Sequence, residues 1–143
     1  MKTNRGFSLL ELLIVVAIIL IIATIAIPSL LRSRQSANET SAVANLRSMN
    51  TAQVSYQSSH SGLFGNRTDL VNAGLLDNRF TGMVSGYLYT VTLSANSLDY
   101  TLDAIATSTN SGRYDYYTLP DYVIRYSTFA SRAPGGLSGQ PVR

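Results

Sequence analysis

Residues 5–31 have the sequence RGFSLLELLIVVAIILIIATIAIPSLL, an apolar stretch in which Glu11 is the one acidic residue. Apart from Glu11, all residues from Phe7 to Ile27 are apolar or small. Twenty-one residues of α-helix span roughly 32 Å, which matches the hydrocarbon thickness of a membrane. A carboxylate in that environment costs on the order of a few kcal/mol. The stretch therefore predicts a membrane-length helix in which Glu11 requires an explanation.

Two simple interpretations leave something unexplained. A secretory signal peptide accounts for Lys2 and Arg5, but the apolar run is longer than the usual roughly 7–15 residues. Its cleavage site would be the loose small-x-small match at 24–26, giving a mature chain that starts near Ile27. A plain membrane anchor accounts for the length and leaves Glu11 as a cost. In either case Lys2 and Arg5 favour a cytoplasmic N-terminus, although Arg32 and Arg34 oppose this orientation.

A third interpretation explains more residues at once. Residues 5–31 resemble the N-terminus of type IV prepilins, in which a short basic leader ends in Gly, the next residue is usually Phe, and Glu is the fifth mature residue. The resemblance implies cleavage after Gly6 by a prepilin peptidase and N-methylation of Phe7. It also implies that Glu11 neutralises the amino terminus of a neighbouring subunit during filament assembly. Pro28 stands where many members carry a helix-disrupting proline, so we expect a kink or local melting there.

The spacing of Phe7 and Glu11 agrees with this role. Four residues apart on a helix, they lie on one face about one turn apart. The apolar run contains no Lys or Arg, so the α-amino group created by cleavage supplies the cation that a buried carboxylate needs. Pairing between staggered helices would also fix their axial register.

Charge and cysteine content exclude several classes of function. The chain has 11 basic and 8 acidic residues, and without Lys2 and Arg5 the remaining arginines are scattered. Phosphate binding needs a clustered basic surface, so no specific nucleic-acid site is predicted. The absence of cysteine removes thiol catalysis, Fe–S clusters and thiolate zinc sites. An exported domain without disulfides must be held together by packing alone.

Residues 29–60 remain helical in pattern but become amphipathic. One apolar stripe recurs at steps of three and four residues. It consists of Ala42, Leu46, Met49, Ala52 and Tyr56. The other faces carry Arg34, Gln35, Asn38, Glu39, Asn45, Arg47 and Asn50. We expect one helix from Phe7 to about His60, which ends at the segment SSHSG (58–62) and packs its stripe against a globular head.

The rest of the chain predicts a small antiparallel sheet. Alternating patterns cover 86–94 and 97–106, and a short turn at 95–96 between them indicates a hairpin. A third pattern covers 121–129. The expected fold is therefore α+β, with the long helix packed against a sheet of three or four strands, which is also the fold that the pilin resemblance implies.

Three smaller features complete the head. A short helix is expected over 68–76, with Thr68 as N-cap and Gly74 as a late breaker. Alternating tyrosines such as Tyr87, Tyr89 and Tyr100 are expected to pack the sheet on the helix. The tail 131–143 contains glycines and prolines, has nothing to hold it, and is expected to be mobile.

The residues of the head do not predict catalysis. His60 is the single histidine, and the chain has no G-x-S-x-G or H-E-x-x-H motif. We therefore predict that the protein is not an enzyme and has no cofactor. Asp115 and Asp121 flank a proline-containing loop, where major pseudopilins, which are close relatives of pilins, often bind calcium. Two acids are too few to predict a metal site, and these two residues remain the calcium candidates.

These observations predict four segments: a cleaved leader (1–6), a transmembrane or filament-core helix half (7–28), an amphipathic half (29–60) and the head (61–143). The resemblance implies an inner-membrane precursor with a cytoplasmic N-terminus. It also implies assembly into an extracellular homo-oligomeric pilus for adhesion, motility or DNA uptake, with prepilin peptidase and the pilus or secretion assembly machinery as partners. One alternative is a pseudopilin of a type II secretion system, which would form a periplasmic pseudopilus. Another is an anchored or secreted ligand-binding module whose N-terminus only mimics a prepilin.

Overall fold

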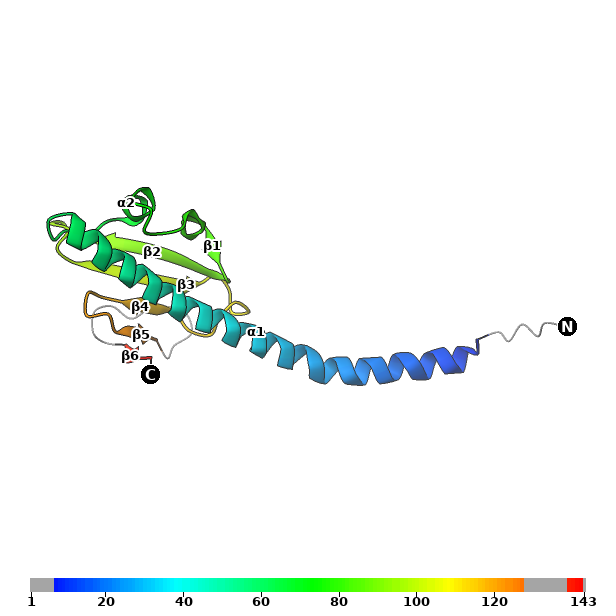
Figure 1. The fold of residues 1–143 in the computed structure, drawn as a ribbon. Helices are drawn as coiled ribbons and strands as arrows, with labels where there is room; N and C mark the ends of the chain where they lie inside the picture. Colours follow the sequence, from blue (N-terminus) through cyan, green and yellow to red (C-terminus); the bar gives the residue numbers. More distant parts are fainter. Residues whose placement is uncertain (1–6, 128–138, 143) are drawn as a thin grey trace. The chain divides into compact units, whose positions relative to one another are not determined.

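A computed structural model describes residues 7–127 and 139–142 (Figure 1). The predicted leader and most of the predicted mobile tail lie outside the described residues. The chain divides into two compact units, residues 1–33 and residues 34–143. All strands and the buried core among the described residues belong to the second unit.

Helix α1 runs from Leu9 to Ser59, close to the predicted bounds. Pro28 lies inside it, and the kink or melting expected at this residue stays a prediction. The helix ends where Ser61 and Gly62 adopt positive φ angles of 54° and 83°. Gly62 N then donates to Gln57 O at 3.1 Å, a left-handed termination of the kind that satisfies free carbonyls at a helix end.

The sheet is an antiparallel meander in which each strand pairs with the next along the chain (Figure 1). Its six described strands are β1 (Met83–Val84), β2 (Tyr87–Leu93), β3 (Tyr100–Ala106), β4 (Tyr116–Thr118), β5 (Ile124–Tyr126) and β6 (Gln140–Pro141). The predicted α+β fold is confirmed. The described residues form more strands than the three or four expected, because β1 and β6 have two residues each and are too short to show a period.

The predicted hairpin corresponds to β2 and β3, whose register runs from Tyr87 opposite Ala106 to Leu93 opposite Tyr100. The predicted two-residue turn at 95–96 is wrong, because the strands are joined by residues 94–99. Asn96 Oδ1 accepts hydrogen bonds from Leu98 N and Ser94 Oγ, and this local bonding holds a wider loop. Leu98, which lies in this loop, is 59% exposed.

Two short helices follow α1. Helix α2 spans Arg67–Asn72, and η1, a 3₁₀-helix, spans Asn78–Thr81. The N-cap of α2 is Asn66 and not Thr68 as predicted. Asn66 Oδ1 accepts from Asp69 N, and Asp69 Oδ2 accepts from Asn66 N. This reciprocal capping box satisfies two free donors of the first turn, which a Thr68 cap would not do.

The apolar stripe of α1 is confirmed as part of the core. Ala42, Leu46, Met49 and Ala52 are buried, and Tyr56 packs against them half-buried. Tyr87, Tyr89 and Tyr100 are buried opposite them, as expected. Figure 1 shows the residue 34–59 part of α1 lying across one face of the sheet.

Three polar residues that the sequence pattern placed on the other faces of α1 are also buried: Glu39, Asn45 and Asn50. Asn45 Nδ2 donates to Tyr89 Oη at 2.9 Å. Asn50 Oδ1 accepts from Tyr100 Oη at 2.9 Å. Buried polar groups require such partners, and a pattern that counts only apolar residues does not reveal them.

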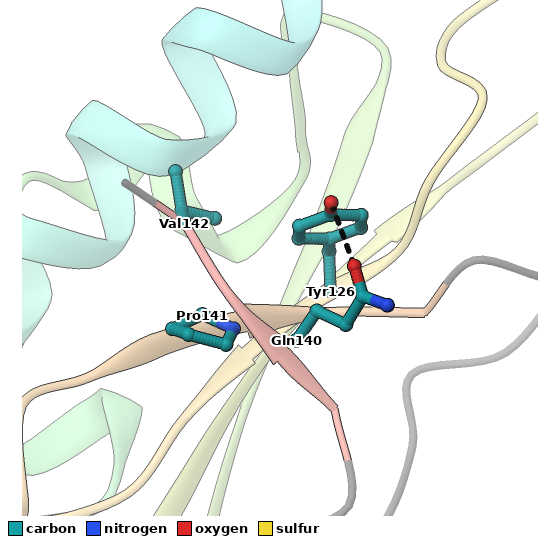
Figure 2. A pocket seen from close by; sticks show the side chains of 4 residues that line it. All are labelled: Tyr126, Gln140, Pro141 and Val142. Carbon is teal, nitrogen blue, oxygen red and sulfur yellow. Dashed lines mark hydrogen bonds between the residues drawn. The ribbon is translucent and has the colours of Figure 1, made fainter.

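The end of the tail also differs from expectation. Residues 140–142 are held to β5, since Val142 N donates to Ile124 O at 2.8 Å and Tyr126 Oη donates to Gln140 Oε1 at 3.1 Å. Figure 2 shows the side chains of Tyr126, Gln140, Pro141 and Val142, which line a surface pocket. Backbone pairing supplies the attachment that side-chain patterns in the tail did not indicate.

The buried tyrosines predict a loss of stability in alkali. Burial raises the pKa of Tyr87, Tyr100 and Tyr116 well above the ordinary value of 10.0. Their contribution to stability is complete below pH 10 and is lost as pH rises further, because these groups ionise in the unfolded chain first. Above pH 10 the free energy of unfolding should fall by about 1.4 kcal/mol per pH unit for each of these tyrosines.

Urea unfolding of the full chain in detergent micelles, followed by circular dichroism between about pH 8 and about pH 11, measures this slope. Tyr100→Phe should make the fall of the unfolding free energy with pH less steep, by about 1.4 kcal/mol per pH unit, which is the contribution of one tyrosine. An unfolding midpoint independent of pH over this range would contradict the prediction.

Gly112 provides a packing prediction. A Cβ atom at this position would overlap Tyr87 Oη, which donates to Tyr114 O at 2.8 Å. Gly112→Ala should lower the free energy of unfolding by about 1–3 kcal/mol. Gly82→Ala, whose Cβ would meet no atom closer than 4.0 Å, is the matched control and should change it by less than about 0.5 kcal/mol. Adding Tyr87→Phe to Gly112→Ala should recover part of the loss, and no recovery would show that another contact is responsible.

Candidate functional site

The N-terminal unit exposes a continuous apolar surface. Its large side chains from Phe7 to Leu31 are all solvent-accessible, with Phe7 and Leu10 each 75% exposed. None of residues 7–33 is buried. By length and composition, α1 is the one helix among the described residues that is long and apolar enough to cross a membrane. An uncovered apolar surface of this extent marks a site of contact with lipid or with other chains.

Glu11 lies in the first turn of this helix. Ser8 O accepts from Glu11 N at 3.1 Å and from Leu12 N at 3.2 Å, so the first turn is formed by backbone bonds. The Glu11 side chain is exposed, and neither ion pair found among the described residues involves it. A carboxylate in the first turn is favoured by the helix dipole. It is also accessible to a cation that approaches from outside.

A second polar side chain of the segment is bonded within the helix. Thr24 Oγ1 donates to Ile21 O at 2.7 Å within the same helix. Phe7 lies two residues before the first residue of α1, and Gly6 lies outside the described residues. The described part of the predicted site therefore consists of Phe7 and Glu11 at the start of an apolar helix, with Glu11 as its unpaired charge.

The two calcium candidates have separate partners. Asp121 forms an ion pair with Arg125, and this guanidinium holds the pKa of the carboxyl below its ordinary value of 3.8. Asp115 is buried, and its Oδ1 accepts from Ala106 N at 2.8 Å. Within residues 7–127 and 139–142, no group of three or more His, Cys, Asp or Glu residues is arranged to hold a metal ion.

His60 lies just after the end of α1. Its ring stacks on Tyr56 with centroids 3.8 Å apart, and its Nδ1 lies 3.0 Å from Tyr56 O and 2.9 Å from Ser59 Oγ. These contacts belong to a helix terminus, as expected for a surface histidine.

Two charged features of the head have no counterpart in the sequence pattern. The pKa of Asp103 is raised, mainly by burial of its carboxyl group and to a smaller extent by the negative charge of Asp115. Glu39 and Arg113 form an ion pair with 2.9 Å between Oε2 and Nη2. Glu39 occurs at a polar position of the helix pattern and Arg113 in a loop 74 residues later, so no local signal links them.

Comparison with known proteins agrees with this geometry. Residues 1–27 match the family model described as the prokaryotic N-terminal methylation motif. Over 75 residues the chain is 41% identical to the type IV wide pilus major component PilA4 of Thermus thermophilus, which covers 52% of this chain and 57% of that protein. Over 53 residues it is 49% identical to the type IV major pilin protein PilA of Myxococcus xanthus, which covers 37% of this chain and 24% of that protein.

Each match thus spans less than two thirds of the relative's length. The methylation motif coincides with the start of the exposed apolar helix. The head adds the antiparallel sheet on the second part of that helix. The chain thus resembles type IV pilins in its N-terminal motif, in its sequence identity to the two relatives and in its α+β fold.

Proposed function

We propose that the protein is the structural subunit of a type IV pilus-like filament. The observation that carries this proposal is the exposed apolar segment of residues 7–31, with one carboxylate, Glu11, that has no ion-pair partner among the described residues. Such a surface needs lipid before assembly and other subunits afterwards. Copies of the same helix supply both the apolar cover and, from the amino group of Phe7, the missing positive charge.

The proposed pathway begins with a single-pass precursor in the inner membrane, with its N-terminus in the cytoplasm because Lys2 and Arg5 are retained there. Prepilin peptidase cleaves after Gly6, and Phe7 is N-methylated. The assembly machinery then extracts the subunit into a helical homo-oligomer, in which Glu11 pairs with the amine of an adjacent Phe7. Residues 7–28 form the filament core, residues 29–60 connect to it, and residues 61–143 form the outer head.

The names of the relatives favour a pilus over a pseudopilus, since one is a wide pilus component and the other a major pilin. We therefore propose an extracellular fibre that serves adhesion, motility or DNA uptake. The match of residues 1–27 to the methylation motif argues against a ligand-binding module with a mimicking signal. Imaging of sheared surface fibres, with identification of their subunit, separates a pilus from a periplasmic pseudopilus.

Processing is tested at Gly6. Gly6→Arg should block the peptidase, because a large charged side chain replaces the small residue before the cleaved bond, and unprocessed protein should accumulate in the inner membrane. Asn4→Arg adds the same charge two residues earlier and should be cleaved normally. Immunoblots and N-terminal sequencing distinguish the forms. Mature protein starting at Phe7 from the Gly6→Arg variant would refute the prepilin assignment.

Assembly is tested at Glu11. Glu11→Ala leaves the amine of a neighbouring Phe7 buried without its counter-charge, and removing one partner of a buried pair costs about 3–5 kcal/mol. The loss recurs at every subunit added, so filaments should be absent, while insertion and cleavage continue because the helix becomes more apolar. Thr24→Ala, which alters a self-satisfied polar group in the same helix, should still form filaments.

Electron microscopy counts the fibres, and a gel of the same cells shows leader cleavage. Abundant normal filaments made only of the Glu11→Ala subunit would show that the carboxylate has no part in assembly.

A further inference from the structure

Three side chains at the start of the residue 34–59 part of α1 bind one loop. Gln35 Nε2 donates to Thr109 O at 2.6 Å, and Asn38 Nδ2 donates to Ser111 O at 2.8 Å. Glu39 Oε1 accepts from Arg113 N at 2.8 Å. The loop of residues 107–113, which we call the clasp loop, is thus bonded to slightly more than one helical turn.

Glu39 forms the strongest of these contacts. It is 7% exposed, and its two carboxylate oxygens accept from Nε and Nη2 of Arg113 at 3.1 and 2.9 Å in addition to the backbone bond. A bidentate bond between a guanidinium and a carboxylate is stronger and more directional than a neutral hydrogen bond. A buried carboxylate that lost these donors would be left uncompensated.

The clasp loop is itself held in shape. Thr107 N and Oγ1 both donate to Gly86 O, and Ser111 Oγ lies 2.9 Å from Ser108 Oγ. Gly86 has a φ of 76°, and a Cβ there would lie 2.8 Å from Ser111 Cβ. The loop therefore presents fixed carbonyl acceptors to the helix, so that helix and loop constrain each other.

The residues before this point have no comparable restraint of their own. None of residues 7–33 is buried, and their one side-chain hydrogen bond, from Thr24, stays within the helix. Pro28 cannot donate a backbone hydrogen bond to the helix. Local opening is least costly where buried contacts are fewest, so opening of α1 should stop where the side-chain contacts begin.

We propose that the clasp loop confines the conformational freedom of α1 to residues before Gln35. Residues 9–33 can then change their helical bonding without unfolding the unit of residues 34–143. The use of this property in transfer from lipid to filament rests on the proposed function. The contacts between the clasp loop and α1 are a property of the monomer. They can therefore be present or absent independently of any filament.

Hydrogen exchange of the full-length chain in detergent micelles, read by mass spectrometry, tests the proposal. In the wild type, amide protection should be lower around Pro28 than in residues 36–44. The double variant Asn38→Ala and Glu39→Ala should accelerate exchange in residues 36–44 at least about tenfold, while the amides of β3 change little. Arg113→Lys keeps the positive charge but cannot form the bidentate bond to Glu39. It should also accelerate exchange in residues 36–44, to a smaller extent.

Gln53→Ala is the matched control. Gln53 is also buried on α1 and bonds both N and O of Gly65, but it lies toward the other end of the head. It should leave exchange in residues 36–44 within about twofold of the wild type. Unchanged exchange in residues 36–44 of both clasp variants would overturn the proposal. Equal acceleration in residues 36–44 and β3 would also overturn it, because the pair would then stabilise the head as a whole.

Discussion

Buried hydrogen bonds from α1 to the sheet and to the segment between α1 and α2 determine how the head is built. Asn45 is hydrogen-bonded to Tyr89, Asn50 to Tyr100 and Thr118, and Gln53 to Gly65. Sliding the helix by one turn, about 5.4 Å, would break all of them and leave buried amides and hydroxyls without partners. Apolar packing alone tolerates such shifts far better. In a chain without cysteine, these bonds supply the positional specificity that a disulfide supplies elsewhere.

The tyrosines serve this arrangement in two ways. Their rings fill the space between helix and sheet, as in the edge-to-face pairs of Phe80 with Tyr89 and of Phe64 with Tyr100. Their hydroxyls bond to polar partners: those of Tyr89 and Tyr100 to Asn45 and Asn50 of α1, and that of Tyr87 to Tyr114 O. A leucine could provide the first function but not the second, since it has no hydroxyl to accept from Asn45 Nδ2 or to donate to Asn50 Oδ1. The same hydroxyl places a steric limit on the neighbouring chain, which is why Gly112 must lack a side chain where it passes Tyr87.

The parts of the fold that follow a period could be predicted from the sequence. Repeats of 3.6 or 2 residues determine the bounds of α1, its apolar stripe and the inner faces of β2 and β3. Such a repeat extends over many residues, so one atypical residue does not obscure it. The cap at Asn66, the wide loop around Asn96 and the pairing of β6 depend on one or two side-chain or backbone bonds, and composition does not reveal which of several candidates forms them. At the candidate site, the exposed helix and the position of Glu11 follow from the apolar run alone. The contact between Glu39 and Arg113 joins residues far apart in sequence and could only be seen in the structure.

The two units meet opposite physical requirements. In residues 34–143 nearly every described polar side chain that is buried has a partner, and Asp115 Oδ2 is the single buried side-chain atom of the described residues that lacks one. In residues 7–33 the apolar surface is uncovered and Glu11 has no ion pair. A self-sufficient head gives little reason for association, whereas the helix cannot be stable in water by itself. In the proposed filament the helix directs association, and Glu11, the one charge between Phe7 and Leu31, is the group best placed to determine how neighbouring copies align, because apolar side chains alone attract without fixing an axial position.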